Sequence, residues 1–270
     1  MPDRMFDSNS LILAGGFGMR LGDFGENTPK GLIKLPNGET LLGKLIADLE
    51  KTTGDKLMGD PPASALSASD WRAGRICIVT NARFDGVYRK WLAGEEFSDK
   101  VEVYSNGVEI PEKKNGAIRD LYLAIKHFRL ENDSLLVCPS DTYYDFSFSD
   151  FLDFIYKNND EIVTIVRKME SRSEIKERLG CATLNGDIIT SFVEKPVNPP
   201  SQFAAIPFYF YPAQKLNLIN KYLENGGNPD APGNIISWLL KEGIKIKAYV
   251  VKGKTLDVGT KMDVEKLKGM

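Results

Sequence analysis

Histidine and cysteine are scarce in this sequence. Its 270 residues include one histidine, His127, and three cysteines, Cys77, Cys138 and Cys181. A single histidine excludes zinc sites that need two histidines and leaves a serine or cysteine triad only one candidate base. The cysteines are widely spaced, form no CxxC motif and lie among apolar neighbours, so we expect reduced, buried thiols in a cytoplasmic protein.

Long apolar runs and an excess of one charge are also absent. No run approaches the roughly 18 residues of a membrane span, and the first ten residues are too polar for a signal peptide. Lys and Arg number 35 and Asp and Glu 37, a formal net charge of −2, whereas a general nucleic-acid binder is expected to be basic. We therefore expect a cytoplasmic protein whose partners include neither nucleic acid nor a membrane. A homo-oligomer is left open.

Short apolar runs alternate with helical patterns along the chain. Strands are expected at 11–14, 76–80, 101–104, 134–138 and 162–166, with helices near 41–49, 84–92, 117–127 and 151–156. This alternation is typical of βαβ units with helices on both faces of a sheet.

The alternation of strand and helix patterns ends after residue 180, where Asn185-Gly186-Asp187 predicts a hairpin turn. Strands at 204–211 and 244–251 and helices at 213–223 and 235–242 are expected to follow. The segment Met58–Gly74, rich in Pro, Ala, Ser and Gly, is interpreted as a surface insertion. The predicted fold class is α/β, a Rossmann-like three-layer sandwich with a mainly parallel mixed sheet in one domain, 1–270.

A glycine-rich segment, Gly15-Gly-Phe-Gly-Met-Arg-Leu21, directly follows the first expected strand. Its glycines would let backbone N–H groups approach an anion closely, and the alternative is a tight strand-to-helix turn. The P-loop pattern GxxxxGK[ST] is absent, and the dinucleotide pattern GxGxxG fails because Leu21 stands in place of the third glycine. What remains is a loop with a built-in arginine, Arg20.

Taken with Pro29-Lys30, the longer segment Leu13-Ala-Gly-Gly-Phe-Gly-Met-Arg-Leu21 resembles the signature of the sugar-phosphate nucleotidylyltransferases (NDP-sugar pyrophosphorylases), of the glucose-1-phosphate thymidylyltransferase type. Further segments extend the resemblance over nearly the whole chain: Asn115-Gly-Ala-Ile118, Val137-Cys-Pro-Ser-Asp-Thr142, Arg178-Leu-Gly180, Phe192-Val-Glu-Lys-Pro196 and Leu256-Asp-Val-Gly-Thr260. The departures are Ser140 for a usual glycine, Ala117 for a common threonine and Lys34 for a common proline.

The resemblance implies a nucleotide-diphospho-sugar transferase fold and a nucleotidyl transfer reaction. A nucleoside triphosphate (NTP) and a sugar 1-phosphate would give an NDP-sugar and pyrophosphate, with dTTP or UTP and glucose 1-phosphate as the expected pair. The attacking phosphate is already an anion, so no general base is needed, and catalysis rests on positioning and charge neutralisation. Residues of about 1–150 would bind the nucleotide, and those of about 151–270 the sugar phosphate.

The resemblance also implies roles for individual residues. Asp141 and Asp257 would hold Mg²⁺, the expected cofactor. Arg20 would grip the leaving pyrophosphate, and Lys30 would lie near the α-phosphate. The residues implied to bind the nucleotide are Leu13, Ala14, Gly15, Gly16, Gly18 and Gly116.

On the sugar side, Lys195 would hold the phosphate of the sugar phosphate and act as a third catalytic cation. Glu194 would accept hydrogen bonds from sugar hydroxyls, and Gly180 would let the sugar ring approach. His127, at the end of its helix, is interpreted as structural.

Two other functions stay open at this point. One keeps the chemistry but transfers the nucleotidyl group to an alcohol phosphate, such as phosphocholine or a polyol phosphate. The Arg178–Gly180 and Glu194–Pro196 segments favour a sugar instead. The other is a catalytically inactive, ligand-sensing relative, which would be expected to have lost one of Arg20, Lys30, Asp141 or Asp257, all of which are present.

Overall fold

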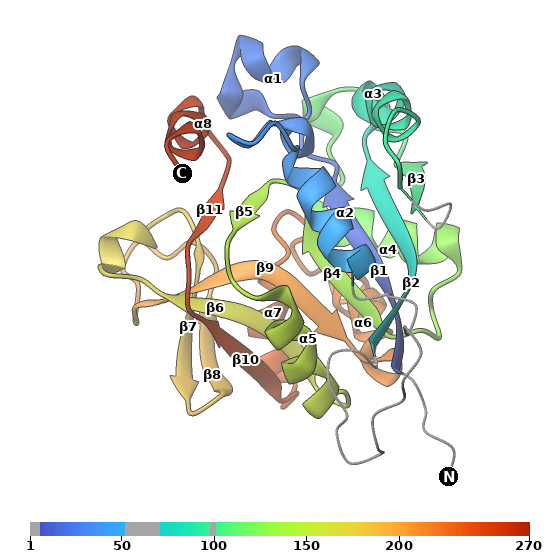
Figure 1. Cartoon of the computed structure of the whole chain (residues 1–270). Helices are drawn as coiled ribbons and strands as arrows, with labels where there is room; N and C mark the ends of the chain where they lie inside the picture. Colours follow the sequence, from blue (N-terminus) through green and yellow to red (C-terminus); the bar gives the residue numbers. More distant parts are fainter. Residues whose placement is uncertain (1–5, 52–70, 98–100) are drawn as a thin grey trace, which may run out of the picture.

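The structure, a computed structural model, describes residues 6–51, 71–97 and 101–270 (Figure 1). Its strands are β1 (Phe6–Ala14), β2 (Trp71–Thr80), β3 (Val101–Ser105), β4 (Leu135–Pro139), β5 (Thr142–Tyr144), β6 (Ile162–Lys168), β7 (Gly180–Asn185), β8 (Ile188–Val193), β9 (Phe203–Tyr211), β10 (Ile246–Val251) and β11 (Thr255–Asp257). Its α-helices are α1 (Asp23–Asn27), α2 (Leu41–Lys51), α3 (Ala82–Leu92), α4 (Ala117–Phe128), α5 (Phe148–Lys157), α6 (Leu218–Glu224), α7 (Asn234–Lys241) and α8 (Lys261–Lys268). Short 3₁₀ turns join them at Met19–Leu21, Lys30–Leu32, Pro111–Lys113, Arg172–Glu174 and Ala213–Lys215.

One sheet runs through both parts of the chain in the order β3-β2-β1-β4-β9-β6-β10-β8-β7. The first four strands are parallel, and β10 is parallel to β6. β9 runs antiparallel between β4 and β6, and β7 forms the expected hairpin with β8 and also pairs with β9. The sheet is mixed, as predicted, but it is mainly parallel only as far as β4, because the β7–β8 hairpin and β9 reverse the chain direction.

Helices cover both faces of the sheet, so the predicted layering is present (Figure 1). The alternation of side chains along β1 sets the two faces: Leu11 packs in the core with α4, α6 and α7, and Ile12 packs in the core with α2, α3 and α5. All three cysteines are buried and unpaired, as expected. His127 stacks on Tyr104 at the end of α4, with ring centroids 4.1 Å apart.

The last part of the chain returns to the first part. β11 pairs antiparallel with β5, and α8 packs beside the glycine loop. The shared cluster comprises Leu21, Ile33, Leu35, Leu41, Val258, Val264 and Leu267. Asp257 therefore lies beside β5, in the first part of the chain, although it is near the end of the sequence.

Most of the segment interpreted as an insertion, residues 58–70, lies outside the described residues, and residues 71–74 belong to β2. Among the residues that the structure describes, none of the helices has the length and apolar character needed to cross a membrane.

Candidate active site

A cleft of about 420 Å³ lies where the carboxyl ends of β1 and β4 meet the turn after β8. All but one of the residues predicted to form the site line it: Leu13, Gly15, Gly16, Gly18, Arg20, Lys30, Gly116, Asp141, Gly180, Glu194, Lys195 and Asp257. The exception is Ala14, which faces the core shared with α2 and α3. Successive side chains of a strand point to opposite faces, so Leu13 and Ala14 cannot share one surface.

The glycine loop leaves β1 and enters the first 3₁₀ turn. Gly18 has φ of 67°, a left-handed backbone conformation that favours glycine. Gly16 is different, because a Cβ built there meets no atom within 4 Å. Its missing side chain therefore leaves open space in the cleft rather than room for protein packing.

Lys30 and Asp141 form an ion pair, with Nζ 2.8 Å from Oδ2 and both side chains less than a quarter exposed. The Asp141 carboxylate raises the pKa of Lys30 in spite of burial, and Asp257 adds to the rise. The pKa of Asp257 is raised to about 6. Burial and the charge of Asp141 raise it, and the charges of Lys30 and Arg20 act in the opposite direction. The four charged groups therefore influence one another directly.

The pairing of β5 with β11 brings the two carboxylates together. Asp257 lies opposite Thr142, and the Val258 N–H donates to the Asp141 carbonyl at 2.9 Å. Two neighbouring carboxylates suit a hard divalent cation, and Mg²⁺ commonly takes one or two carboxylates together with substrate phosphates. In the described part of the chain no metal-binding group of three or more His, Cys, Asp or Glu side chains forms. Asp141 and Asp257 would therefore supply two ligands, with waters and substrate phosphates as the others.

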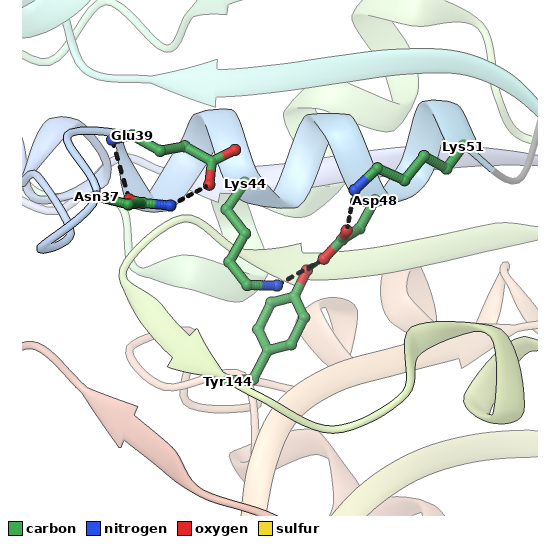
Figure 2. Close-up of polar contacts among 6 residues, drawn as sticks. All are labelled: Asn37, Glu39, Lys44, Asp48, Lys51 and Tyr144. Carbon is green, nitrogen blue, oxygen red and sulfur yellow. Dashed lines mark hydrogen bonds and ion pairs between the residues drawn. The ribbon is translucent and has the colours of Figure 1, made fainter. Parts of the chain in front are cut away.

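A polar cluster anchors β5 to helix α2 (Figure 2). Tyr144 Oη donates to Asp48 Oδ2 at 2.9 Å, and Lys44 Nζ lies 2.6 Å from the same oxygen. Lys44 Nζ also lies 3.8 Å from the centre of the Tyr144 ring. Burial works to raise the pKa of Asp48, but the contacts with Lys44 and Tyr144 leave it below its ordinary value. This cluster fixes the strand that follows Asp141.

Glu194 and Lys195 both face the cleft although they are adjacent. β8 ends at Val193, and Lys195 has φ of 46°, so the chain turns where an extended strand would send the two side chains apart. Lys195 Nζ lies 4.0 Å from Glu194 Oε1. Burial raises the pKa of Glu194, Lys195 opposes that rise and Asp230 adds to it.

Two glycines enclose the Glu194 carboxylate. A Cβ at Gly180 would lie 2.5 Å from the Phe192 ring and 3.1 Å from Glu194 Oε2. A Cβ at Gly233 would overlap the same oxygen. Gly180 therefore makes room for Phe192 and Glu194, in addition to any ligand that approaches it.

Gly116 is held against the loop that precedes α7. Its φ is 88°, and a Cβ there would overlap the Pro229 carbonyl. The N–H groups of Ala117 and Ile118 donate to the Asp230 and Pro229 carbonyls, at 3.2 and 2.9 Å. This backbone packing requires glycine at position 116 independently of any nucleotide.

Among the charged cleft residues, Lys114, Asp120 and Asp230 were given no role from the sequence, and Arg178 was named only as part of the motif that ends at Gly180. Asp120 had a recognisable signal, because it is an acidic residue on the apolar side of a helix beside Leu121 and Ala124, and it is buried. Arg178 pairs with Asp263 of α8 at 3.2 Å, and Asp230 pairs with Lys114 at 2.5 Å. Neither of these pairings has a local signal in the sequence.

Comparisons with known proteins agree with the motif resemblance at the level of the family. A family model described as nucleotidyl transferase matches residues 49–268, which exclude the glycine loop. Among curated relatives, the glucose-1-phosphate adenylyltransferase of Bacillus subtilis is 30% identical over 165 residues, 58% of this chain and 42% of the relative. The glucose-1-phosphate adenylyltransferase of Mycoplasma mobile is 34% identical over 128 residues, 46% of this chain and 33% of the relative. The chain thus matches less than half the length of each.

A solved structure has the same fold. It is assigned as a glucose-1-phosphate thymidylyltransferase from Bacillus anthracis in complex with sucrose, and it superposes with a TM-score of 0.73 over 97% of this chain and 94% of the other, at 21% identity. That similarity supports a nucleotide-diphospho-sugar transferase fold. Since the family model covers well over half of the sequence, the chain belongs to the nucleotidyl transferase family.

Proposed function

We propose that this protein transfers a nucleotidyl group from an NTP to a sugar 1-phosphate. The observation that carries the proposal is the composition of the cleft. Its lining includes Arg20, Lys30 and the Asp141–Asp257 pair, which we call the nucleotide wall, and Glu194 and Lys195 just after β8, which we call the sugar wall. The cleft thus offers cations and a carboxylate pair for a triphosphate, and a separate acid–base pair for a second phosphorylated substrate.

In the proposed reaction, a phosphate oxygen of the sugar 1-phosphate attacks the α-phosphorus of the NTP. The new bond joins that oxygen to the α-phosphorus, and the bond from the α-phosphorus to the bridging oxygen of the β-phosphate breaks. Pyrophosphate leaves with the bonding electrons. The nucleophile is already an anion, so the residues need to position two polyanions and offset their charge rather than remove a proton.

The residues divide that work. Lys30 would offset charge at the α-phosphate and Arg20 charge on the leaving pyrophosphate, while Lys195 would hold the phosphate of the incoming sugar. Glu194, held between two glycines, would accept hydrogen bonds from sugar hydroxyls. Asp141 and Asp257 would hold Mg²⁺, which supplies further neutralisation of phosphate charge when bound.

Two NTP classes are candidates within this proposal. The sequence resemblance favours dTTP or UTP with glucose 1-phosphate. The curated relatives are named adenylyltransferases acting with glucose 1-phosphate, which adds ATP.

Pyrophosphate release tests the proposal. ATP, CTP, GTP, UTP and dTTP would each be incubated with Mg²⁺ and either a hexose 1-phosphate or an alcohol phosphate such as phosphocholine. We expect release only with a sugar 1-phosphate, and its loss in Asp257→Asn. Release only with the alcohol phosphate would assign a different acceptor. No release with any pair, together with NTP binding, would indicate a ligand-binding relative.

A further inference from the structure

Asp120 is a buried residue that lines the cleft beside the glycine loop. The residue lies in the first turn of α4, lines the cleft and is 6% exposed. Its Oδ2 faces Gly15 so closely that a Cβ on Gly15 would lie 2.6 Å from it. The contact is with the first residue of the loop, while Arg20 stands at the other end.

Two amides fix the other oxygen of this carboxylate. Asn106 Nδ2 donates to Asp120 Oδ1 at 2.8 Å, and Asn115 Nδ2 donates to the same atom at 2.9 Å. The Asn106 amide is itself held, because its Oδ1 accepts from the Val108 N–H at 2.9 Å. Within the described residues Oδ2 receives no hydrogen bond, so the arrangement holds one acceptor toward the cleft.

Helix capping does not explain why an aspartate, Asp120, stands in the first turn of α4. The N-cap of α4 is Gly116, and no side chain makes a cap hydrogen bond there. The first N–H groups of the helix are taken by the carbonyls of residues 229 and 230. A carboxylate is also an unfavourable neighbour for a triphosphate, whereas a ligand group that donates a hydrogen bond would suit Oδ2.

We infer that Asp120 is a specificity-determining residue that accepts a hydrogen bond from the exocyclic amino group of the nucleobase. The inference rests on the proposed binding of an NTP in this cleft. Adenine, cytosine and guanine carry an amino donor, whereas uracil and thymine carry carbonyl oxygens on both sides of their single N–H. A carbonyl oxygen facing Oδ2 would leave a buried acceptor unpaired and repelled. ATP, CTP or GTP is therefore preferred over UTP and dTTP, in contrast to the preference drawn from sequence resemblance.

The experiment is calorimetric binding of ATP, CTP, GTP, UTP and dTTP, with Mg²⁺ and without sugar phosphate, to the wild type and to Asp120→Asn. We expect the wild type to bind at least one amino-bearing NTP about 10- to 100-fold more tightly than UTP or dTTP, the effect of one hydrogen bond to a charged group. Asp120→Asn should bring that ratio close to one. Asp150→Asn, which changes an exposed first-turn acid of α5 outside the cleft, should leave the ratio unchanged.

Two outcomes would overturn the inference. One is a wild type that binds UTP or dTTP as tightly as every amino-bearing NTP, which decides the question even if Asp120→Asn does not fold. The other is a variant that loses the same factor for all five NTPs, as a purely structural role would produce. NTP binding and turnover without an amino preference would remove this inference and leave the proposed function in place. Selective binding of amino-bearing NTPs without turnover would keep this inference and contradict the proposed function.

Discussion

The two walls of the cleft hold their charged groups in different ways. On the proposed nucleotide side, Lys30 is 2.8 Å from Asp141, and Asp257 and Arg20 act on the same pair. On the proposed sugar side, the Glu194 carboxylate is half-buried between two glycines, and Lys195 Nζ lies 4.0 Å from it. The first wall depends on charge balance and the second on close packing around one acid.

This difference has a consequence for mutational behaviour. Charge balance depends on side chains that a ligand would also use, so changes there should affect catalysis more than folding. The packing around Glu194 depends on the absence of side chains, so changes there should affect recognition and fold together. The variants below test that division, from the largest expected effect to the smallest.

Loss of a carboxylate from the nucleotide wall should have the largest effect on turnover. Asp257→Asn would remove one of the two proposed Mg²⁺ ligands and should lower kcat at least 10²-fold, on the order of the loss of a preorganised charge contact. Because burial and Asp141 raise the pKa of Asp257 to about 6, its charge is unfavourable in the folded protein. The melting temperature of the variant should therefore be unchanged or higher.

The measurements are steady-state pyrophosphate release and thermal unfolding of the same preparations. Excess EDTA should abolish wild-type turnover and be reversed by Mg²⁺. Full activity in EDTA would contradict the metal assignment. A large fall in melting temperature for Asp257→Asn would mean that this wall is structural.

Arg20→Ala should slow turnover about 10²–10³-fold, because a fixed cation at the leaving group would be lost. The matched control is Arg119→Ala, an exposed arginine on α4 outside the cleft, which should retain wild-type kcat. Single-turnover kinetics would separate an effect on chemistry from one on release of pyrophosphate.

Gly16→Val tests the loop without charge. Its Cβ position is open and its φ is not left-handed, so valine would occupy cleft space without straining the backbone. We expect calorimetric NTP affinity to fall at least 10-fold with little change in melting temperature. Unchanged affinity would show that the glycine loop is not the nucleotide cradle.

On the sugar wall, Lys195→Ala and Glu194→Gln should produce different defects. Lys195→Ala should lower kcat/KM toward every sugar phosphate by roughly 10-fold or more, since a charged phosphate contact is lost. Glu194→Gln replaces a pure acceptor by an amide that also donates, so it should mainly reduce discrimination among sugars. NTP affinity measured without sugar phosphate should change little in both. Loss of NTP affinity in both, with KM for the sugar phosphate unchanged, would move this pair to the nucleotide side.

Much of the fold followed from periodicity, and the exceptions are short elements. α2, α4 and β9 carry enough apolar repeats to be predicted within two residues, whereas β1 begins at Phe6, five residues before its predicted start. β5 and β11 have three residues each, too few for a period, and they form only because they pair with each other across more than a hundred residues. That pairing is what brings the two predicted metal ligands together.

The site shows the same division between local and long-range signals. Arg20, Lys30 and Lys195 stood in ordered motifs, and the structure brings them to one cleft. Gly233 had no such signal, because its reason is a contact with Glu194 from a different element. Gly116 was singled out for a nucleotide, whereas its immediate physical reason is the Pro229 carbonyl. Motifs thus located the charged groups, and only tertiary contacts explain Gly116 and Gly233.

The smallest effect on turnover is expected behind the nucleotide wall, where Tyr144 and Asp48 anchor β5 to α2 (Figure 2). Tyr144→Phe should lower the free energy of unfolding by about 1.5–3 kcal/mol, the usual contribution of one hydrogen bond to a charged group. Tyr143→Phe, on the same strand and half-buried, is the matched control and should lose less. Urea denaturation at neutral pH measures both, and kcat per folded molecule should stay close to that of the wild type.

The pH dependence of Asp48→Asn separates the ion pair from simple packing. The contacts with Lys44 and Tyr144 outweigh burial and lower the pKa of Asp48 in the folded protein, so the folded state binds a proton less readily than the unfolded chain. The stabilisation is complete above the unfolded pKa of about 4 and is lost as pH falls through the lower folded value. The difference in unfolding free energy between wild type and Asp48→Asn should therefore be constant from about pH 7 to pH 5 and shrink below about pH 4. A difference that stays constant into the acid range would assign the stability to shape rather than charge, and the nucleotide wall would then be supported by packing, as the sugar wall is.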